Sequence, residues 1–179
     1  SGALPEYQIK QWLVKILPSQ YAALVAEAEA LDAKGDREGA RVLYEQVVEQ
    51  EPGNAKARAG LARLLLLSEP ARSRNVVEPL EGEAGYAELC DAVRTLAPLL
   101  ERPESALPEG ASKDAYALAV GSIRNGEFSE ALERFIGILR EDRPYDNDGS
   151  RKACIAIFRL LGEDHDITRR FRRSFDRAF

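Results

Sequence analysis

The side chains that most often carry chemistry are scarce in this chain of 179 residues. His165 is the only histidine, which excludes metal sites built from several histidines and Ser-His-Asp triads, and we expect it to lie in a turn or to cap a helix. Cys90 and Cys154 lack the spacing of metal or redox motifs, so we expect buried, inert thiols. The acidic run at 142–149 departs from the calcium-loop pattern, and Asp148 is expected to cap the next helix. We predict a non-enzymatic chain without cofactor or metal site.

Charge is distributed unevenly along the chain. Residues 1–150 contain 17 Lys+Arg and 26 Asp+Glu, whereas residues 151–179 contain 8 and 4. The basic end can complement the acidic body and the helix dipole, or it can form a docking surface, and the sequence leaves both explanations open. The acidic body repels phosphate, so nucleic acid is not an expected partner. No apolar run approaches the roughly 18 residues that cross a membrane, and no signal segment opens the chain, so we expect a cytoplasmic protein.

A six-residue motif occurs twice and predicts the elements that position these residues. Residues 35–40 read GDREGA and residues 126–131 read GEFSEA, and an aromatic residue follows the last alanine of each copy by four positions. A glycine with positive φ ends a helix, and an alanine lets two helices cross closely beside an aromatic side chain. We therefore predict two-helix hairpins with packing positions at Ala28, Gly35, Ala40, Tyr44, Ala62, Ala119, Gly126, Ala131 and Phe135.

These residues resemble the tetratricopeptide repeat, a helix-turn-helix unit of 34 residues. One step of this period carries Ala28 onto Ala62 but Gly35 onto Glu69, so an irregular helical pair is expected within 68–110. The predicted fold class is all-α, with tetratricopeptide-like helical hairpins stacked as a short solenoid of about ten helices. The expected helices after the first are 19–34, 37–50, 55–67, 71–80, 85–100, 113–125, 127–141, 148–161 and 166–178.

The start of the chain carries a second resemblance. Residues 2–6 (GALPE) precede an apolar stripe that contains Ile9, Trp12, Leu13 and Ile16, and the segment resembles the closing helix of a thioredoxin-like domain. Such a helix followed by repeats is similar to the chaperedoxin family. The implied domains are the closing helix of a missing thioredoxin-like domain at 1–18, a first helical lobe at 19–102, a linker at 103–112 and a second lobe with a C-terminal docking helix at 113–179.

The resemblance to chaperedoxins implies a function. It implies a cytoplasmic, stress-response chaperone of the holdase type, whose partners are unfolded client proteins and larger chaperones such as the chaperonin. The chain has no Cys-x-x-Cys motif, so any redox chemistry belongs to the missing domain. The alternative is a scaffold that binds one defined partner peptide without general chaperone activity. The oligomeric state stays open between a monomer and a weak dimer, and we expect the stripe around Trp12 to be repacked or covered by another molecule.

The last predicted helix combines aromatic and basic residues. Ile167, Phe171, Phe175 and Phe179 recur every four residues and form one apolar face, while arginines occupy much of the remainder. We expect the first two to pack on the helix at 148–161 and the last two to be uncovered, because chain ends fray. The resulting hypothesis is a docking element for a larger chaperone, formed by Phe171, Arg173, Phe175, Arg177 and Phe179.

Overall fold

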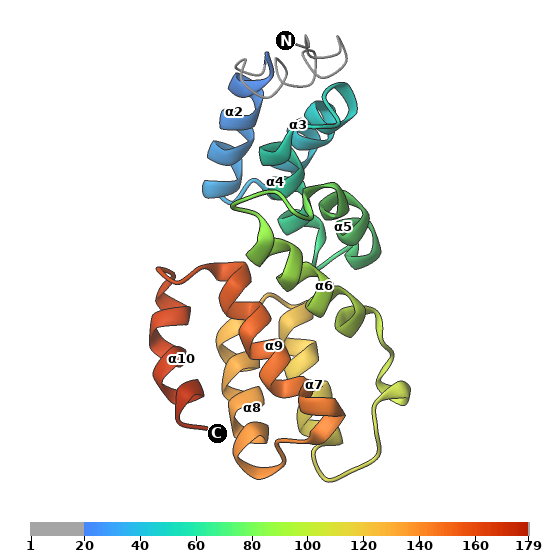
Figure 1. The fold of residues 1–179 in the computed structure, drawn as a ribbon, viewed down its shortest axis with the longest axis vertical. Coiled ribbons are helices and arrows are strands. Elements are labelled where there is room, and N and C mark those ends of the chain that lie inside the picture. Colours follow the sequence, from blue (N-terminus) through green and yellow to red (C-terminus); the bar gives the residue numbers. More distant parts are fainter. Residues whose placement is uncertain (1–19, 179) are drawn as a thin grey trace, which may run out of the picture. The chain divides into compact units, whose positions relative to one another are not determined.

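The computed structural model describes residues 20–178, and the regular structure within this range is entirely helical (Figure 1). The all-α prediction is confirmed, and the predicted helix bounds agree with the observed ones to within three residues. The predicted helix at 1–18, with its apolar stripe, lies outside the described residues. The helices are α2 (Ala22–Ala33), α3 (Arg37–Gln50), α4 (Ala55–Leu65), α5 (Pro70–Val77), η1 (Glu78–Leu80), α6 (Ala87–Glu101), η2 (Glu104–Ala106), α7 (Lys113–Arg124), α8 (Phe128–Glu141), α9 (Tyr145–Leu161) and α10 (Asp166–Asp176).

The chain divides after Ala57 into two compact units. In the first unit, α2 packs on α3, and Gly35 between them has a φ of 86°. This left-handed residue lets the Asp36 N–H reach the Leu31 carbonyl at 3.0 Å, which closes the end of α2. The Asp36 carboxylate then accepts the Gly39 N–H at 3.0 Å and caps α3. Short-range chemistry therefore builds the whole turn.

The second unit repeats this turn between α7 and α8. Gly126 has a φ of 77°, and the N–H of Glu127 donates to the Ser122 carbonyl at 2.9 Å, as in the first copy. Phe135 of α8 meets Tyr116 of α7 edge to face, with ring centroids 5.2 Å apart. The predicted packing alanines and aromatics of both units are all buried, namely Ala28, Ala40, Tyr44, Ala62, Ala119, Ala131 and Phe135.

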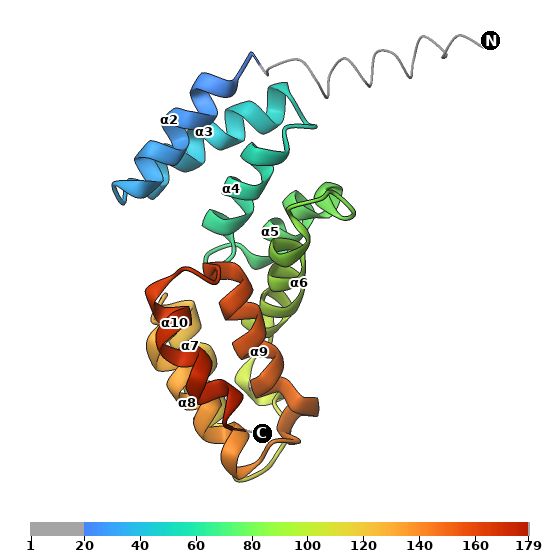
Figure 2. The same ribbon diagram turned by 60° about the vertical axis from the view of Figure 1, so that its left-hand side comes forward.

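Helix α6 joins the remaining helices of the second unit. It packs on α5 through one side and on α9 through another, and α8 packs on both α7 and α9. The Ser73 hydroxyl of α5 is buried and donates to the Ala62 carbonyl of α4 at 2.7 Å. Helix α10 closes this body by packing along α8 and α9 (Figure 2). The irregular pair expected within 68–110 is thus the pair α5 and α6.

The structure does not separate two lobes at 103–112, where the sequence predicts a linker. Leu107 in this segment is buried, the Tyr145 hydroxyl donates to the Pro108 carbonyl at 2.7 Å, and the Ser112 hydroxyl donates to Asp142 at 2.8 Å. Arg124 of α7 also donates to the Leu100 carbonyl at the end of α6 at 3.0 Å. The prolines make this segment irregular, but tertiary hydrogen bonds fasten it to the second unit. The division after Ala57 therefore differs from the predicted boundary.

Candidate functional site

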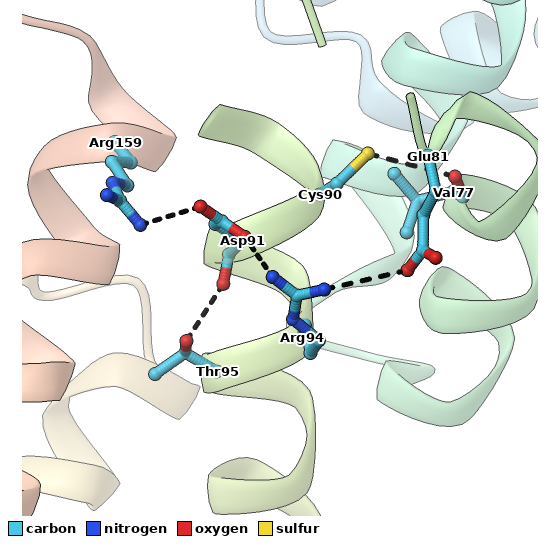
Figure 3. Close-up of polar contacts among 7 residues, drawn as sticks. All are labelled: Val77, Glu81, Cys90, Asp91, Arg94, Thr95 and Arg159. Carbon is cyan, nitrogen blue, oxygen red and sulfur yellow. Dashed lines mark hydrogen bonds and ion pairs between the residues drawn. The ribbon is translucent and has the colours of Figure 1, made fainter. Parts of the chain in front are cut away.

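Polar contacts of the second unit converge on α6. Asp91 accepts a hydrogen bond from Arg159 of α9 at 2.9 Å and another from Arg94, which in turn approaches Glu81 to 3.8 Å (Figure 3). The Thr95 hydroxyl donates to the main-chain oxygen of Asp91 at 2.8 Å. The pair of Arg94 and Glu81 is mostly exposed, so it adds little stability. Asp91 and Arg159 instead connect α6 directly to α9.

A cavity of about 320 Å³ opens farther along α6, beside the start of α9. Pro98 and Leu99 of α6 and Ala153 of α9 form its apolar wall, and Arg102 and Lys152 bring charge to it. Its volume lies near the lower end of the range for small-ligand pockets, roughly 300 to 1,000 Å³. The cavity can therefore hold a group the size of one or two amino-acid side chains.

An ion pair stands in the wall of this cavity. Arg102 donates two hydrogen bonds to Asp146, one of them from Nη1 to Oδ1 at 3.0 Å. Burial alone would raise the pKa of Asp146, but hydrogen bonds from Arg102 and Tyr116 outweigh burial and lower it. Burial, reinforced by the Asp146 charge, raises the pKa of the Tyr116 hydroxyl. At neutral pH the group is therefore a carboxylate held by a guanidinium and a neutral phenol.

The backbone beside this ion pair has an uncommon conformation. Asp146, Asn147 and Asp148 have consecutive positive φ values of 51°, 56° and 62°, at the start of α9. Residues other than glycine rarely adopt this region, and each such residue is strained by about 1 to 2 kcal/mol. Surrounding contacts hold the turn: Lys152 Nζ donates to the Asn147 carbonyl at 2.7 Å, and Arg151 Nε donates to Asp148 at 2.6 Å.

The turn corrects one prediction about Asp148. The sequence predicts that this carboxylate caps the following helix, but it accepts the Arg151 side chain instead of a main-chain N–H. The left-handed turn directs the chain so that Gly149 lies against Tyr116. A Cβ atom at position 149 would stand 2.4 Å from the Tyr116 hydroxyl. Glycine is therefore required here by close approach of α7.

A second hollow, of about 410 Å³, lies where α5 and η1 meet α6. Arg74 and Arg94 face it together with Glu78 and Glu81, so its charges balance. Cys90 borders it as a buried, free thiol, and its Sγ donates to the Val77 carbonyl oxygen at 3.9 Å. Burial, aided by the charges of Glu81 and Asp91, raises the pKa of this thiol. The thiol is therefore protonated at neutral pH and is a poor nucleophile.

Helix α10 buries its aromatic residues, which corrects the prediction for the chain end. Phe171 is buried, and Phe175 is only 4% exposed. Phe175 meets Phe158 of α9 edge to face, with ring centroids 5.3 Å apart. The sequence does not reveal that α8 and α9 extend far enough to cover this turn. Phe171 and Phe175 are therefore core residues, and Phe179 lies outside the described residues.

The arginines of α10 fall into two groups. Arg169 pairs with Asp164 at 2.7 Å, and Arg172 pairs with Glu163 at 3.3 Å while its guanidinium lies over the Phe158 ring. A second group, Arg170, Arg173 and Arg177, is exposed and forms no ion pair with any residue between 20 and 178. We call this second group the arginine face. His165, in the turn before α10, accepts the Ile167 N–H at 3.2 Å and caps the helix, as predicted.

Comparison with protein families agrees with the hairpins and their glycine turns. A family model described as Tetratricopeptide repeat matches residues 104–179, and another with the same description matches residues 31–69. The chain contains a tetratricopeptide repeat region. The first match contains α7 to α10, and the second contains the end of α2 together with α3 and α4. The resemblance to chaperedoxins stays a prediction. A comparison with curated proteins found no match.

Tetratricopeptide repeats are typically non-enzymatic modules that bind other proteins, so the repeats of this chain imply protein-protein interaction. Within residues 20–178, no group of three or more His, Cys, Asp or Glu side chains is placed to hold a metal ion. None of the described helices combines the length and apolar character needed to span a membrane.

The cavity residues were not identified from the sequence. Arg102 is the last residue of the predicted first lobe, directly before the predicted linker, and Asp146 falls in a turn whose acidic residues suggest helix capping. Their separation of 44 positions leaves no periodic signal. In the sequence this turn is marked only by Asn147-Asp148-Gly149, which indicates a bend but not its left-handed geometry. Only the packing of α6, α7 and α9 brings these side chains together.

Proposed function

We propose that this tetratricopeptide region is a protein-binding module that docks onto an acidic segment of a partner protein through the arginine face of α10. The observation that supports this proposal is that α10 has one buried aromatic face and one exposed basic face. Phe171 and Phe175 are in the core, while Arg170, Arg173 and Arg177 point outward without acidic partners in the described structure. The apolar side of α10 therefore holds the helix in place and leaves the basic side free for binding.

The spacing of the arginine face suits a short acidic segment. Positions 170, 173 and 177 follow the helical neighbour spacing, so their side chains lie along one side of α10 over about 10 Å. Like charges at these spacings destabilise a helix by about 0.2 to 0.5 kcal/mol per pair. Carboxylates of a partner relieve this repulsion and form charge-assisted hydrogen bonds with guanidinium groups. Because α10 is already folded and anchored, little conformational entropy is lost on binding.

For this surface, a protein partner is better supported than a nucleic acid. The chain has a formal net charge of −5, so a long polyphosphate is repelled by most of the molecule. A short acidic peptide needs contact only with α10. The general role of tetratricopeptide repeats in protein binding supports the same choice.

Our finer proposal is that the partner is a larger chaperone, such as the chaperonin. The chain would then be the protein-interaction module of a cytoplasmic chaperone of the holdase type. The resemblance of the sequence to chaperedoxins supports this partner. Direct holding of unfolded clients has less structural support, because Val42 and Leu118, 54% and 58% exposed, are the exposed large apolar residues between positions 20 and 178. The scaffold that binds one defined partner is therefore the competing function.

The arginine face can be tested with a defined acidic probe. A labelled 12-residue peptide of alternating Glu and Ala is titrated against the protein, with a Gln-for-Glu peptide as the uncharged control. The variant Arg170→Ala/Arg173→Ala/Arg177→Ala is expected to bind the acidic peptide at least about tenfold more weakly. A matched variant, Arg63→Ala/Arg72→Ala/Arg94→Ala, removes three exposed arginines elsewhere in the second unit and should bind like the wild type. Equal binding by both variants would contradict docking through α10.

A second pair of measurements separates the chaperone from the scaffold. Co-sedimentation with purified chaperonin, using the same two variants, tests the finer partner assignment. Suppression of aggregation is then measured with several unrelated unfolding proteins. A holdase suppresses aggregation of more than one of them, whereas a scaffold suppresses none. Peptide binding without chaperonin binding would keep the docking surface and reject the chaperone partner.

A further inference from the structure

The cavity between α6 and α9 shows features of a site that is formed before its ligand arrives. Three consecutive left-handed residues, Asp146 to Asp148, line it or adjoin it, and such strain persists only where surrounding contacts impose it. Those contacts are present: Arg102 and Tyr116 hold Asp146, and Lys152 holds the Asn147 carbonyl. The wall is therefore fixed by tertiary contacts of Asp146 with Arg102 and Tyr116 and by a local contact within α9.

The charges of the cavity do not cancel. Arg102 and Asp146 neutralise each other through two hydrogen bonds. Lys152 is exposed at the cavity and has no carboxylate within ion-pair distance among the described residues. Its ammonium group donates to one carbonyl, that of Asn147, and has two further N–H groups. The cavity thus presents one uncompensated positive charge with free donors.

The apolar part of the cavity defines the rest of the ligand. The cavity that Lys152 lines has a hydrocarbon wall, formed by Pro98, Leu99 and Ala153. Thr95 also lines it, but its hydroxyl already donates to the main-chain carbonyl of Asp91. A single positive charge matches one carboxylate better than a doubly charged phosphate. The volume of about 320 Å³ admits a short hydrocarbon chain but not a nucleotide.

We propose that this cavity binds a carboxylate attached to a short apolar body, with the carboxylate on Lys152 and the apolar body against Pro98 and Leu99. The carboxylate can belong to an acidic side chain next to an apolar residue in a partner peptide, or to a free small carboxylic acid. This site is separate from the arginine face of α10. Its occupancy does not depend on the docking proposal.

Two probes distinguish the sources of the carboxylate. Hexanoate represents a free acid, and the blocked peptide Ac-Ala-Leu-Glu-Leu-Ala-NH2 represents an internal acidic side chain; hexanamide is the neutral control. Binding is followed by NMR of the intact chain, where the amide signals of Gly149 and Ala153 are expected to shift saturably. Lys152→Ala is expected to weaken binding of the preferred probe by about tenfold, which corresponds to the loss of one charge-assisted contact.

The control variant is Lys113→Ala, which removes a lysine of α7 that pairs with Glu109 and does not line the cavity. It is expected to bind the preferred probe as the wild type does, and so is the triple variant of the arginine face. Saturable binding of either probe that depends on Lys152 supports the proposal and identifies the source. Absence of saturable binding for both probes, equal binding of hexanamide, or unchanged binding by Lys152→Ala would overturn it. Far-ultraviolet circular dichroism checks that each variant is folded.

Discussion

Arg102, the residue after α6, donates two hydrogen bonds to Asp146 at the start of α9, although 44 positions separate them in the chain. The side chains are 29% and 15% exposed, so the pair is partly shielded from water. It connects the end of the irregular helical pair to the left-handed turn and to Tyr116 of α7. The stability of the second unit is therefore expected to depend on this contact more than on its surface ion pairs.

Replacing the guanidinium tests this dependence. Arg102→Ala leaves the Asp146 carboxylate beside the strained turn without its main partner, and we expect the free energy of unfolding to fall by about 2 kcal/mol. Arg94→Ala is the control, because its side chain is 65% exposed and its ion pairs lie at the surface, with an expected loss below about 1 kcal/mol. Urea denaturation followed by circular dichroism measures both. Similar losses for the two variants would show that the pair of Arg102 and Asp146 contributes no more to the free energy of unfolding than a surface ion pair.

The pH dependence of stability follows from the lowered pKa of Asp146. The unfolded carboxyl has a pKa of about 3.9, so both states are ionised at higher pH and the contribution of Asp146 is complete there. As the pH falls below about 4, the unfolded chain takes up a proton that the folded state resists, and this contribution is lost. Asp146→Asn removes the titrating group. The wild type should therefore lose more unfolding free energy than Asp146→Asn between pH 5 and pH 2.5, as measured by urea denaturation at each pH; parallel curves would contradict the prediction.

The close packing of α7 against α8 can be tested by enlarging a buried side chain. Ala131 is fully buried, so Ala131→Leu adds methylene groups where no space exists, and we expect a loss of about 1 to 3 kcal/mol. Ala115→Leu makes the same change at an exposed position of α7 and should be nearly neutral. Thermal unfolding of the two variants gives the comparison. Equal melting temperatures would mean that the hairpin tolerates a larger residue at position 131.

At the chain end, we predict that Phe175 is needed for stability and that Arg177 is not. Phe175→Ala removes a ring that packs on Phe158, and we expect a loss of about 3 kcal/mol or more. Arg177→Ala changes an exposed residue outside the described ion pairs and should leave the unfolding free energy nearly unchanged. Deletion of residues 173–179 should then lower the melting temperature clearly. If the truncated protein melts at the same temperature as the wild type, residues 173–179 do not contribute to the stability of the core.

A double-mutant cycle tests the close approach of Gly149 to α7. Gly149→Ala places a Cβ atom against the Tyr116 hydroxyl and should destabilise the protein by about 1 to 3 kcal/mol. Tyr116→Phe removes the clashing oxygen, so Gly149→Ala is expected to be less destabilising in that background. Chemical denaturation of the four proteins yields the interaction energy. Strict additivity would mean that the two residues do not constrain each other.

Much of the local structure was predictable from the sequence because it arises from neighbours along the chain. Gly35 and Gly126 end their helices in the left-handed region, and Asp36 caps α3, as the repeated motif indicates. His165 caps α10 through its own ring. These features depend on contacts over two to five positions, and the apolar periodicity of each helix supplies the remainder. Secondary structure, hairpin pairing and the tetratricopeptide character follow from the sequence by itself.

Tertiary structure alone decided where the long-range contacts fall. The segment at 103–112 looks like a linker, yet Tyr145 bonds its Pro108 carbonyl and its Ser112 bonds Asp142 of the second unit. Phe175 looks uncovered at the end of a chain, yet α9 presents Phe158 to it. The cavity beside Lys152 depends on the meeting of α6, α7 and α9. Such contacts join residues tens of positions apart, and no periodicity along the chain encodes which distant surfaces will meet.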